Sequence, residues 1–278
     1  MPHGLILYLV LVAVGTAIAA GYWAYRRARR QRLRQIRNFP YAWEQILQRN
    51  LALYRYLPSH LKRELQGDIR VFIDEKHFEG CSGLEITDEM RVTIAAEACL
   101  LLLNRPARFY PNLTTILVYP NIYAAPVREL NGAVVTEHQQ ERLGESWQLG
   151  VVVLAWDAVR AGAADAHDGR NVALHEFAHQ LDGENNRVDG TPALGGRDRY
   201  RIWSQVLGQE FAQLQERIAG LQEHVIDDYG ATSPAEFFAV ATETFFEKPH
   251  DLQAKSPELY RILADFFQLD PATWVPRA

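Results

Sequence analysis

The stretch "NVALHEFAHQLDGEN", residues 171–185, decides how the rest of this 278-residue sequence is interpreted. It places His175 and His179 four residues apart, with Glu176 directly after the first histidine. Residues four apart lie on the same face of an α-helix, so two imidazoles at this spacing can reach one metal ion. The pattern is that of the HExxH zinc hydrolases, in which the glutamate acts as general base on a water molecule. The stretch therefore predicts a helix that carries a zinc site.

The alternative is that this short motif is an accident on an amphipathic surface helix. The residues around the histidines are largely apolar: Val172, Leu174, Phe177, Ala178 and Leu181. This composition predicts a buried helix. Two buried imidazoles and a carboxylate without partners would be costly, and a metal ion removes that cost.

Zinc bound by two histidines needs a third protein ligand and an open position for water. Position 185, six residues after His179, is asparagine, which excludes a third histidine there. The remaining solution is a carboxylate, and the candidates are Glu184, Asp227, Glu236 and Glu243. Glu236 has a second explanation, because "SPAE" at 233–236 also fits a capping box at the start of a helix. The residues alone leave this choice open.

Composition is typical of a globular protein of a reducing compartment. Apolar residues make up 48% of the chain, enough for a substantial core. The two cysteines, Cys81 and Cys99, do not form a disulfide framework. Seven of the 29 basic residues lie in 26–37, so residues 38–278 hold 22 Lys and Arg against 34 Asp and Glu, about −12 in net charge. A body this acidic is not expected to bind nucleic acid.

The N-terminal residues predict a membrane anchor. Residues 4–25 carry no formal charge and are long enough to cross a lipid bilayer as a helix. The aromatic cluster "YWAY" ends this run and suits the membrane interface. A cleaved signal peptide is the alternative, with "AIA" at 17–19 as its cleavage site. Signal peptides, however, carry positive charge before the apolar run, and here the arginines follow it.

The arginines set the predicted orientation. Positive charge directly after a span favours the cytoplasmic side, so we expect a single-pass protein of the inner (cytoplasmic) membrane with its C-terminal domain in the cytoplasm. Two roles remain open for the arginines themselves: contact with anionic lipid, or a solvated linker helix.

The pattern along the chain predicts an α+β fold with helices in excess. We divide it into an anchor with an arginine-rich segment, 1–37, and a catalytic domain, 38–278. Helices are expected after Pro40, from a cap at Thr87, and from about Arg199 onward with breaks near Gly230 and Pro249.

Three short runs rich in β-branched residues predict strands, at 69–74, 114–120 and 151–156. The segment 157–170, rich in Ala, Asp and Gly, is expected to be a loop. Asn171 or a neighbour then opens the helix of the histidines.

Two motifs together carry a family resemblance. "HEFAHQLD" (175–182) followed by "YGATSPAEFFA" (229–239) resembles the Mlc titration factor A family of zinc peptidases. The resemblance extends through "FPYAWEQIL" and "GLEITDEMRVTIAAEACLLLL" and covers about residues 38–275. The same two motifs are similar to the catalytic domain of anthrax lethal factor, in which a tyrosine precedes a ligating glutamate by seven residues.

The resemblance implies a mainly helical zincin-like fold that hydrolyses peptide bonds, with an aminopeptidase-like tendency. It implies zinc ligation by His175, His179 and Glu236. Glu176 would be the general base, and Tyr229 would stabilise the oxyanion.

The resemblance also has departures and an alternative. Lethal factor has a further acid four residues after its ligating glutamate, where this sequence has Val240. We therefore expect Asp182 or Glu243 to orient a ligand instead. The family name implies a second hypothesis, a membrane-tethered protein that sequesters a transcriptional repressor, with catalysis secondary. The anchor and the arginine run are not typical of the soluble family members, so localisation rests on residues 4–25 and the arginines that follow them.

Overall fold

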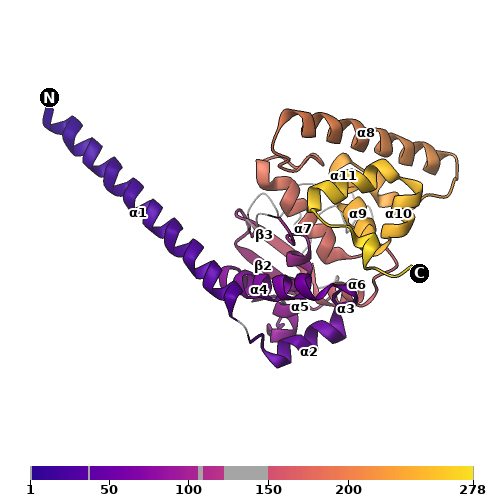
Figure 1. The fold of residues 1–278 in the computed structure, drawn as a ribbon, viewed down its shortest axis with the longest axis horizontal. Coiled ribbons are helices and arrows are strands. Elements are labelled where there is room, and N and C mark those ends of the chain that lie inside the picture. The colour runs from indigo at the N-terminus through magenta and orange to yellow at the C-terminus, as the bar shows by residue number, and fades with distance from the viewer. Residues whose placement is uncertain (1, 37, 106–108, 122–149, 278) are drawn as a thin grey trace, which may run out of the picture.

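The computed structural model describes residues 2–36, 38–105, 109–121 and 150–277, and most of them are helical (Figure 1). The α-helices are α1 (Pro2–Gln35), α2 (Tyr41–Asn50), α3 (Ala52–Tyr56), α4 (Ser59–Glu75), α5 (Asp88–Leu100), α6 (Trp156–Ala164), α7 (Val172–Asp182), α8 (Arg197–Ala219), α9 (Pro234–Glu247), α10 (Pro249–Lys255) and α11 (Pro257–Phe267). Short 3-10 turns are η3 (Gly183–Asn185), η4 (Asp228–Ala231) and η5 (Pro271–Thr273). The strands are β1 (His77–Gly80), β2 (Thr115–Tyr119) and β3 (Val151–Ala155).

The three strands form a small parallel sheet in the order β1-β2-β3. The strands expected at 114–120 and 151–156 are confirmed as β2 and β3. Parallel strands need a crossover between them, and α5 lies in the connection from β1 to β2. The α+β class with helices in excess is confirmed at this level.

The strand expected at 69–74 is wrong, because these residues complete helix α4. Their β-branched composition suggested a strand, but the buried positions Leu61, Leu65, Ile69 and Phe72 follow helical spacing. Burial of this stripe against α5 outweighs local strand propensity. The first strand, β1, begins two residues after α4 ends.

The loop expected at 157–170 is wrong in its first half. Residues 156–164 form α6, and the alanines of "AVRAGAA" favour a helix more than its glycine opposes one. Gly162 also allows a close approach: a Cβ there would lie 3.0 Å from the Cα of Asn171. The glycine that suggested a loop therefore brings α6 against the start of α7.

The helix starts expected from capping residues are confirmed. The Thr87 side chain accepts a hydrogen bond from the Met90 amide at the start of α5. Asn171 accepts from the Leu174 amide at the start of α7. Each cap satisfies an amide that the helix leaves without an internal partner. Helix α2 begins directly after Pro40, and the C-terminal helices break near Gly230 and Pro249 as expected.

Helix α7 lies in the middle of the molecule, between α8–α11 on one side and α2–α6 with the sheet on the other (Figure 1). Its Phe177 is fully buried and packs on Phe72 of α4 and on Tyr110, with ring centroids 5.7 and 5.2 Å apart. Rings at such distances and tilts attract beyond the area they bury. The histidine helix is therefore fixed by aromatic packing on its far face.

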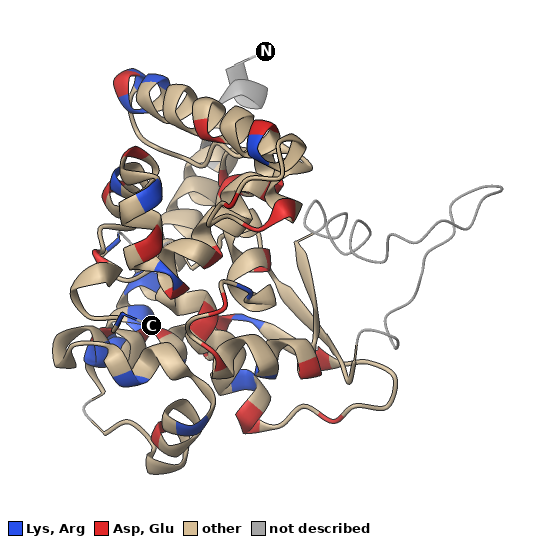
Figure 2. Cartoon of the chain, turned by 90° about the vertical axis from the view of Figure 1, so that its right-hand side faces the viewer, with Lys and Arg blue, Asp and Glu red and all other residues tan. Residues whose placement is uncertain are grey.

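Helix α1 projects away from the rest of the molecule at its N-terminal end (Figure 1). Within the described residues, it is the one helix long and apolar enough to cross a membrane. Its C-terminal part lies against α4. Red and blue residues are interspersed along the surface helices in the view of Figure 2.

Arginines of α1 form ion pairs with acids of α4. Arg26 and Arg30 both contact Glu75, at 2.9 and 2.6 Å, and Arg29 contacts Asp74 at 2.6 Å. Each of these pairs has an acid at the end of α4, next to the point where the apolar part of α1 departs. The part of α1 that carries these arginines is therefore docked on α4 and is not a free linker, although the Arg26 and Arg29 side chains stay 41% and 52% exposed.

Arg34 makes the most buried of these pairs. Both carboxylate oxygens of Asp68 accept hydrogen bonds from its guanidinium, and Asp68 is fully buried. The guanidinium groups of Arg30 and Arg34 also lie over the Phe109 ring, 5.1 and 5.2 Å from its centroid. A Cβ at Gly67 would lie 3.2 Å from the Arg34 Cα, so the helices touch backbone to backbone.

Candidate metal centre

Helix α7 carries the two histidines on one face, as their spacing predicts. The Asn171 cap fixes its first turn, and apolar residues surround it, so His179 is 1% exposed and Glu176 6%. The ring centroids of His175 and His179 are 4.8 Å apart. A helix start that is capped and packed on several sides gives both imidazoles a defined direction.

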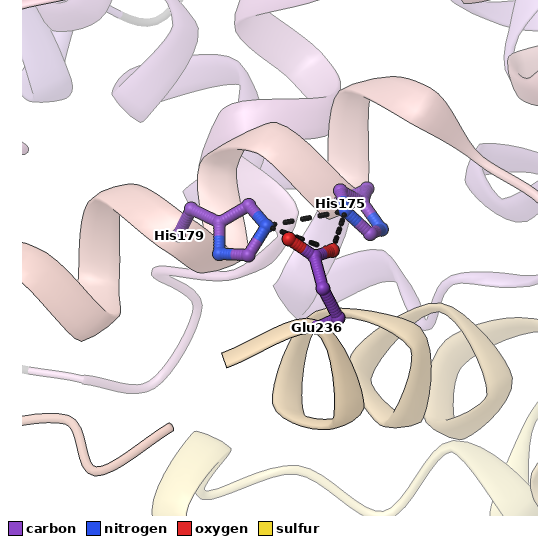
Figure 3. Close-up of side chains that lie close together, drawn as sticks. All are labelled: His175, His179 and Glu236. Atoms are coloured by element: carbon purple, nitrogen blue, oxygen red, sulfur yellow. Dashed lines mark hydrogen bonds and ion pairs between the residues drawn. The ribbon is translucent and has the colours of Figure 1, made fainter. Parts of the chain in front are cut away.

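Glu236 approaches these imidazoles from α9. Ser233 caps α9 by accepting a hydrogen bond from the Glu236 amide, and Pro234 occupies the first turn. The capping interpretation thus holds for the Glu236 backbone, while its carboxylate points at the histidines (Figure 3). The two explanations of this residue are compatible, because they use different atoms.

The three side chains converge on one point. The His175 Nε2 lies 2.9 Å from Glu236 Oε2 and 3.1 Å from His179 Nε2, and the latter lies 3.4 Å from the same carboxylate. Their candidate ligand atoms all lie within 4.8 Å of one another (Figure 3). Two imidazole nitrogens and a carboxylate oxygen directed at one another are all electron-pair donors. This donor set fits a bound metal ion.

A second carboxylate lies behind His175. Glu243, two turns further along α9, approaches the His175 Nδ1 with Oε1 at 2.7 Å. Its other oxygen accepts from the Asn171 backbone amide. A proton on Nδ1 satisfies this contact, which leaves the Nε2 lone pair for a metal ion. Of the two residues expected to orient a ligand, Glu243 has this geometry.

The carboxylates favour positive charge at His175. Burial opposes a charged imidazole, but the hydrogen bonds that the ring can donate to Glu236 and Glu243 outweigh it and raise the pKa of His175 to about 10. The pKa of Glu236 is lowered to about 2, because the two histidines overcome its burial. Burial raises the pKa of Glu176. The electrostatics thus suit a cation at the point where the ligand atoms meet.

Tyr229 lies beside this group on the turn η4. Its ring is 5.9 Å from the His175 ring, measured between centroids. Asp227 caps the turn: Oδ1 accepts from the Tyr229 amide at 3.0 Å, and Oδ2 accepts from Arg170 at 2.8 Å. Because Arg170 directly precedes the cap of α7, this bridge ties the tyrosine turn to the histidine helix.

The other residues considered as ligands have different roles. Asp227 holds the tyrosine turn, and Glu184 lines a cavity of about 560 Å³ between α8 and α11. Asp182, expected as a possible orienting residue, instead accepts from the Gly190 amide at 2.7 Å. A Cβ at Gly190 would lie 2.3 Å from the Pro234 carbonyl oxygen. Asp182 therefore supports the first turn of α9. Val240 is a buried apolar residue.

Comparison with known protein families identifies the family of this chain. The family described as "Glucose-regulated metallo-peptidase M90" matches residues 25–268, most of the chain. The chain belongs to the M90 metallopeptidase family. Its metallopeptidase character and its implied metal ion agree with the His/His/Glu group.

Individual relatives extend the similarity. The uncharacterized protein slr2042 of Synechocystis sp. is 39% identical over 277 residues, 98% of each chain. Mlc titration factor A of Yersinia pestis is 28% identical over 241 residues, 84% of this chain and 87% of that one. The same figures hold for Mlc titration factor A of Yersinia pseudotuberculosis. The resemblance inferred from the sequence is confirmed.

Two buried glutamates that contact the cap of the histidine helix were not anticipated from the sequence. The Asn171 side-chain amide donates to Glu97 of α5 and to Glu247 of α9, both at 3.0 Å. Glu97 is fully buried and Glu247 is 1% exposed. The signal was present, since Glu97 is an acid inside the apolar run "IAAEACLLLL", and acids are rarely fully buried without a partner.

Proposed function

We propose that this protein is a zinc-dependent peptidase. His175, His179 and Glu236 hold the zinc ion in this proposal. The observation that carries it is the convergence of two Nε2 atoms and a carboxylate on one point. Two nitrogens bound to one tetrahedral zinc ion at about 2.0–2.1 Å lie about 3.3 Å apart. The two histidine nitrogens are 3.1 Å apart, which supports zinc.

Two further residues supply the proton chemistry. When bound, zinc lowers the pKa of a water molecule and polarises the scissile carbonyl group. Glu176 accepts a proton from the attacking water and delivers it to the leaving amine. The Tyr229 hydroxyl donates a hydrogen bond to the oxyanion of the tetrahedral intermediate. Peptide bonds are the substrate class, with aminopeptidase-like trimming of N-termini as the favoured mode.

A peptide-library digest by the full-length protein in detergent tests this proposal. Wild type should cleave peptides and hold about one zinc ion per chain. Glu176→Gln should retain the zinc while kcat falls about 10²- to 10⁴-fold, because a proton acceptor is lost without a ligand. A Glu176→Gln variant that cleaves as fast as wild type would exclude Glu176 as the base. New N-termini in the products separate trimming from internal cleavage.

A second candidate function is binding of a transcriptional repressor. Its support is the name of the Mlc titration factor A relatives, which describes an effect on a protein called Mlc. In this alternative the chain is a membrane-tethered protein that sequesters the repressor, and catalysis is secondary. Glu176→Gln discriminates between the two, because repressor binding that persists in this variant is separate from hydrolysis.

We also propose a single-pass location in the inner membrane, with residues 4–25 in the bilayer, the N-terminus outside and domain 38–278 in the cytoplasm. The uncharged apolar helix and the arginines that follow it support this orientation. Protease added to spheroplasts should leave the domain intact. Degradation of the domain would reverse the orientation, and a mature N-terminus near Ala20 would replace the anchor with a signal peptide.

A further inference from the structure

Asn171 connects four structural elements at the start of the histidine helix. Its side-chain oxygen caps α7, and its side-chain amide donates to Glu97 of α5 and Glu247 of α9. Its backbone amide donates to Glu243, which holds the Nδ1 of His175. The fourth element is α6, whose Gly162 lies directly against the Asn171 backbone. The position of this one asparagine therefore determines where Glu243 meets the histidine.

The two outer acids are poorly satisfied as carboxylates. Each receives one hydrogen bond from Asn171 through Oε1, while neither Oε2 has a hydrogen-bond partner among the described residues. No Lys or Arg of the described chain forms an ion pair with Glu97 or Glu247. Ionised carboxylates buried in this way are far costlier than neutral acids, because a full charge loses its hydration without compensation.

Neighbouring acids act in the same direction at Glu247. The other titratable or charged groups around the pair are Glu243 on α9, His175 behind it, and Asp168 and Arg170 before α7. Arg170 is directed at Asp227. Burial, reinforced at Glu247 by neighbouring acids, raises the pKa of Glu97 to about 7 and raises that of Glu247 as well. Both acids therefore hold a proton to a higher pH than an exposed glutamate does.

We propose that Glu97 and Glu247 are positioning residues that act as uncharged carboxylic acids, hold the Asn171 amide between them, and thereby fix the contact of Glu243 with His175. This inference rests on the proposed function insofar as His175 binds zinc. The acids do not touch the metal or the substrate. A neutral acid offers a carbonyl oxygen to Asn171 without placing further negative charge behind the metal centre.

Glutamine is nearly isosteric with a protonated glutamate, so it provides the matched variant. Glu97→Gln and Glu247→Gln in the full-length protein should keep zinc affinity within about 2-fold of wild type. Glu97→Leu fills similar space but cannot accept from Asn171, so zinc affinity should fall about 10-fold or more, as is usual for losses outside the ligand shell. The probe is Zn²⁺ alone, in competition with a chelator.

The protonation state has its own readout, which does not require activity or metal. A glutamate whose pKa is raised in the folded protein stabilises the fold below its unfolded pKa and loses that contribution as pH rises through the folded value. As pH rises from about 4.5 to about 7, the metal-free wild type should therefore lose stability relative to Glu97→Gln, and the difference should level off above that range. The measurement is the difference in Tm between the two proteins at each pH.

Three outcomes would overturn the inference. A Tm difference independent of pH would show that Glu97 is not a titrating neutral acid. A large loss of zinc affinity in Glu97→Gln, or a requirement for added Na⁺ or K⁺, would show that the acids act as carboxylates around a cation. Unchanged zinc affinity in Glu97→Leu would remove the positioning role. If wild type binds no zinc, the proposed function fails, while the pH test of the acids still stands.

Discussion

Two regions of this molecule bury carboxylates, and they do so in opposite ways. Where α1 meets α4, Asp68 and Glu75 each face guanidinium groups, so each acid is balanced by at least one arginine. Around His175, helices α5 and α9 bring buried glutamates together, and among the described residues no Lys or Arg is ion-paired to them. In one region the acids are paired with arginines, and the other region holds an excess of acid.

The difference shows whether a region needs a bound cation or proton in the folded state. A contact whose acids are paired with arginines needs neither, and it contributes only to how the two helices are held together. Several buried acids without basic partners are stable only when protons or a metal ion neutralise their charge. Such a cluster therefore indicates a site where a proton or a metal ion is bound in the folded protein. Acid clusters in the interior therefore distinguish a reactive centre from a structural joint.

The largest effect is expected from removing one of the proposed zinc ligands in the acid-rich region. His179→Ala leaves two ligands, too few to retain zinc against a chelator. Zinc content should fall from about one ion per chain to below about one tenth, and peptidase activity by more than about 1,000-fold. Metal analysis and a peptide assay measure both. Glu184→Gln, which alters an acid beside the α8–α11 cavity, is the control and should retain zinc.

A smaller effect is expected at Tyr229, which lies beside the ligands without supplying one. Tyr229→Phe keeps the ring next to His175 but removes the donor to the oxyanion. We expect kcat to fall about 10²- to 10³-fold with KM and zinc content unchanged, since the contact forms mainly in the transition state. Steady-state kinetics test this, and an unchanged kcat would make Tyr229 a packing residue.

Breaking the balanced region should change stability and leave chemistry intact. Arg34→Ala strands the buried carboxylate of Asp68 and should cost about 1–3 kcal/mol, less than a fully buried pair because Arg34 is 37% exposed. Asp68→Asn should cost less, since Arg34 can turn to water. Urea unfolding compares the two variants. Equal losses would mean that the pair acts through packing alone.

The smallest effect is a pH dependence of the same pair. Burial outweighs Arg34 and raises the pKa of Asp68 to about 6. A raised pKa means that stability from this group is present at low pH and lost as pH rises through about 6. The cost of Arg34→Ala should therefore shrink at pH 5 and grow toward pH 8. A cost that is constant over this range would contradict a titrating Asp68.

The sequence predicted best where a local rule decides the outcome. Thr87, Asn171 and Ser233 each start a helix because a short polar side chain caps the nearest amides, which depends on a few adjacent residues. The proposed ligand group, whose side chains do lie close together, followed from helical spacing plus the family resemblance. That resemblance selected Glu236 where the capping rule left two explanations open.

Prediction failed where distant packing decides the outcome. Residues 69–74 have strand-like composition, but burial against α5 makes them helical. The arginines of α1 find acids 34 to 49 residues away, a pairing that local pattern does not encode. Glu97 and Glu247 are 150 residues apart in sequence, and only the fold brings both to Asn171.

Helix α1 runs without a break from its apolar end through the arginines docked on α4, about 50 Å at 1.5 Å per residue. A flexible tether would let an enzyme search a hemisphere of solution. A helix fixed at both ends removes that freedom, so a chain anchored as proposed turns about one axis while its metal centre stays at a constant height above the lipid. Substrates must then present their scissile bonds at that height. The distance of a cleavage site from the membrane would therefore help to determine which substrates are cut.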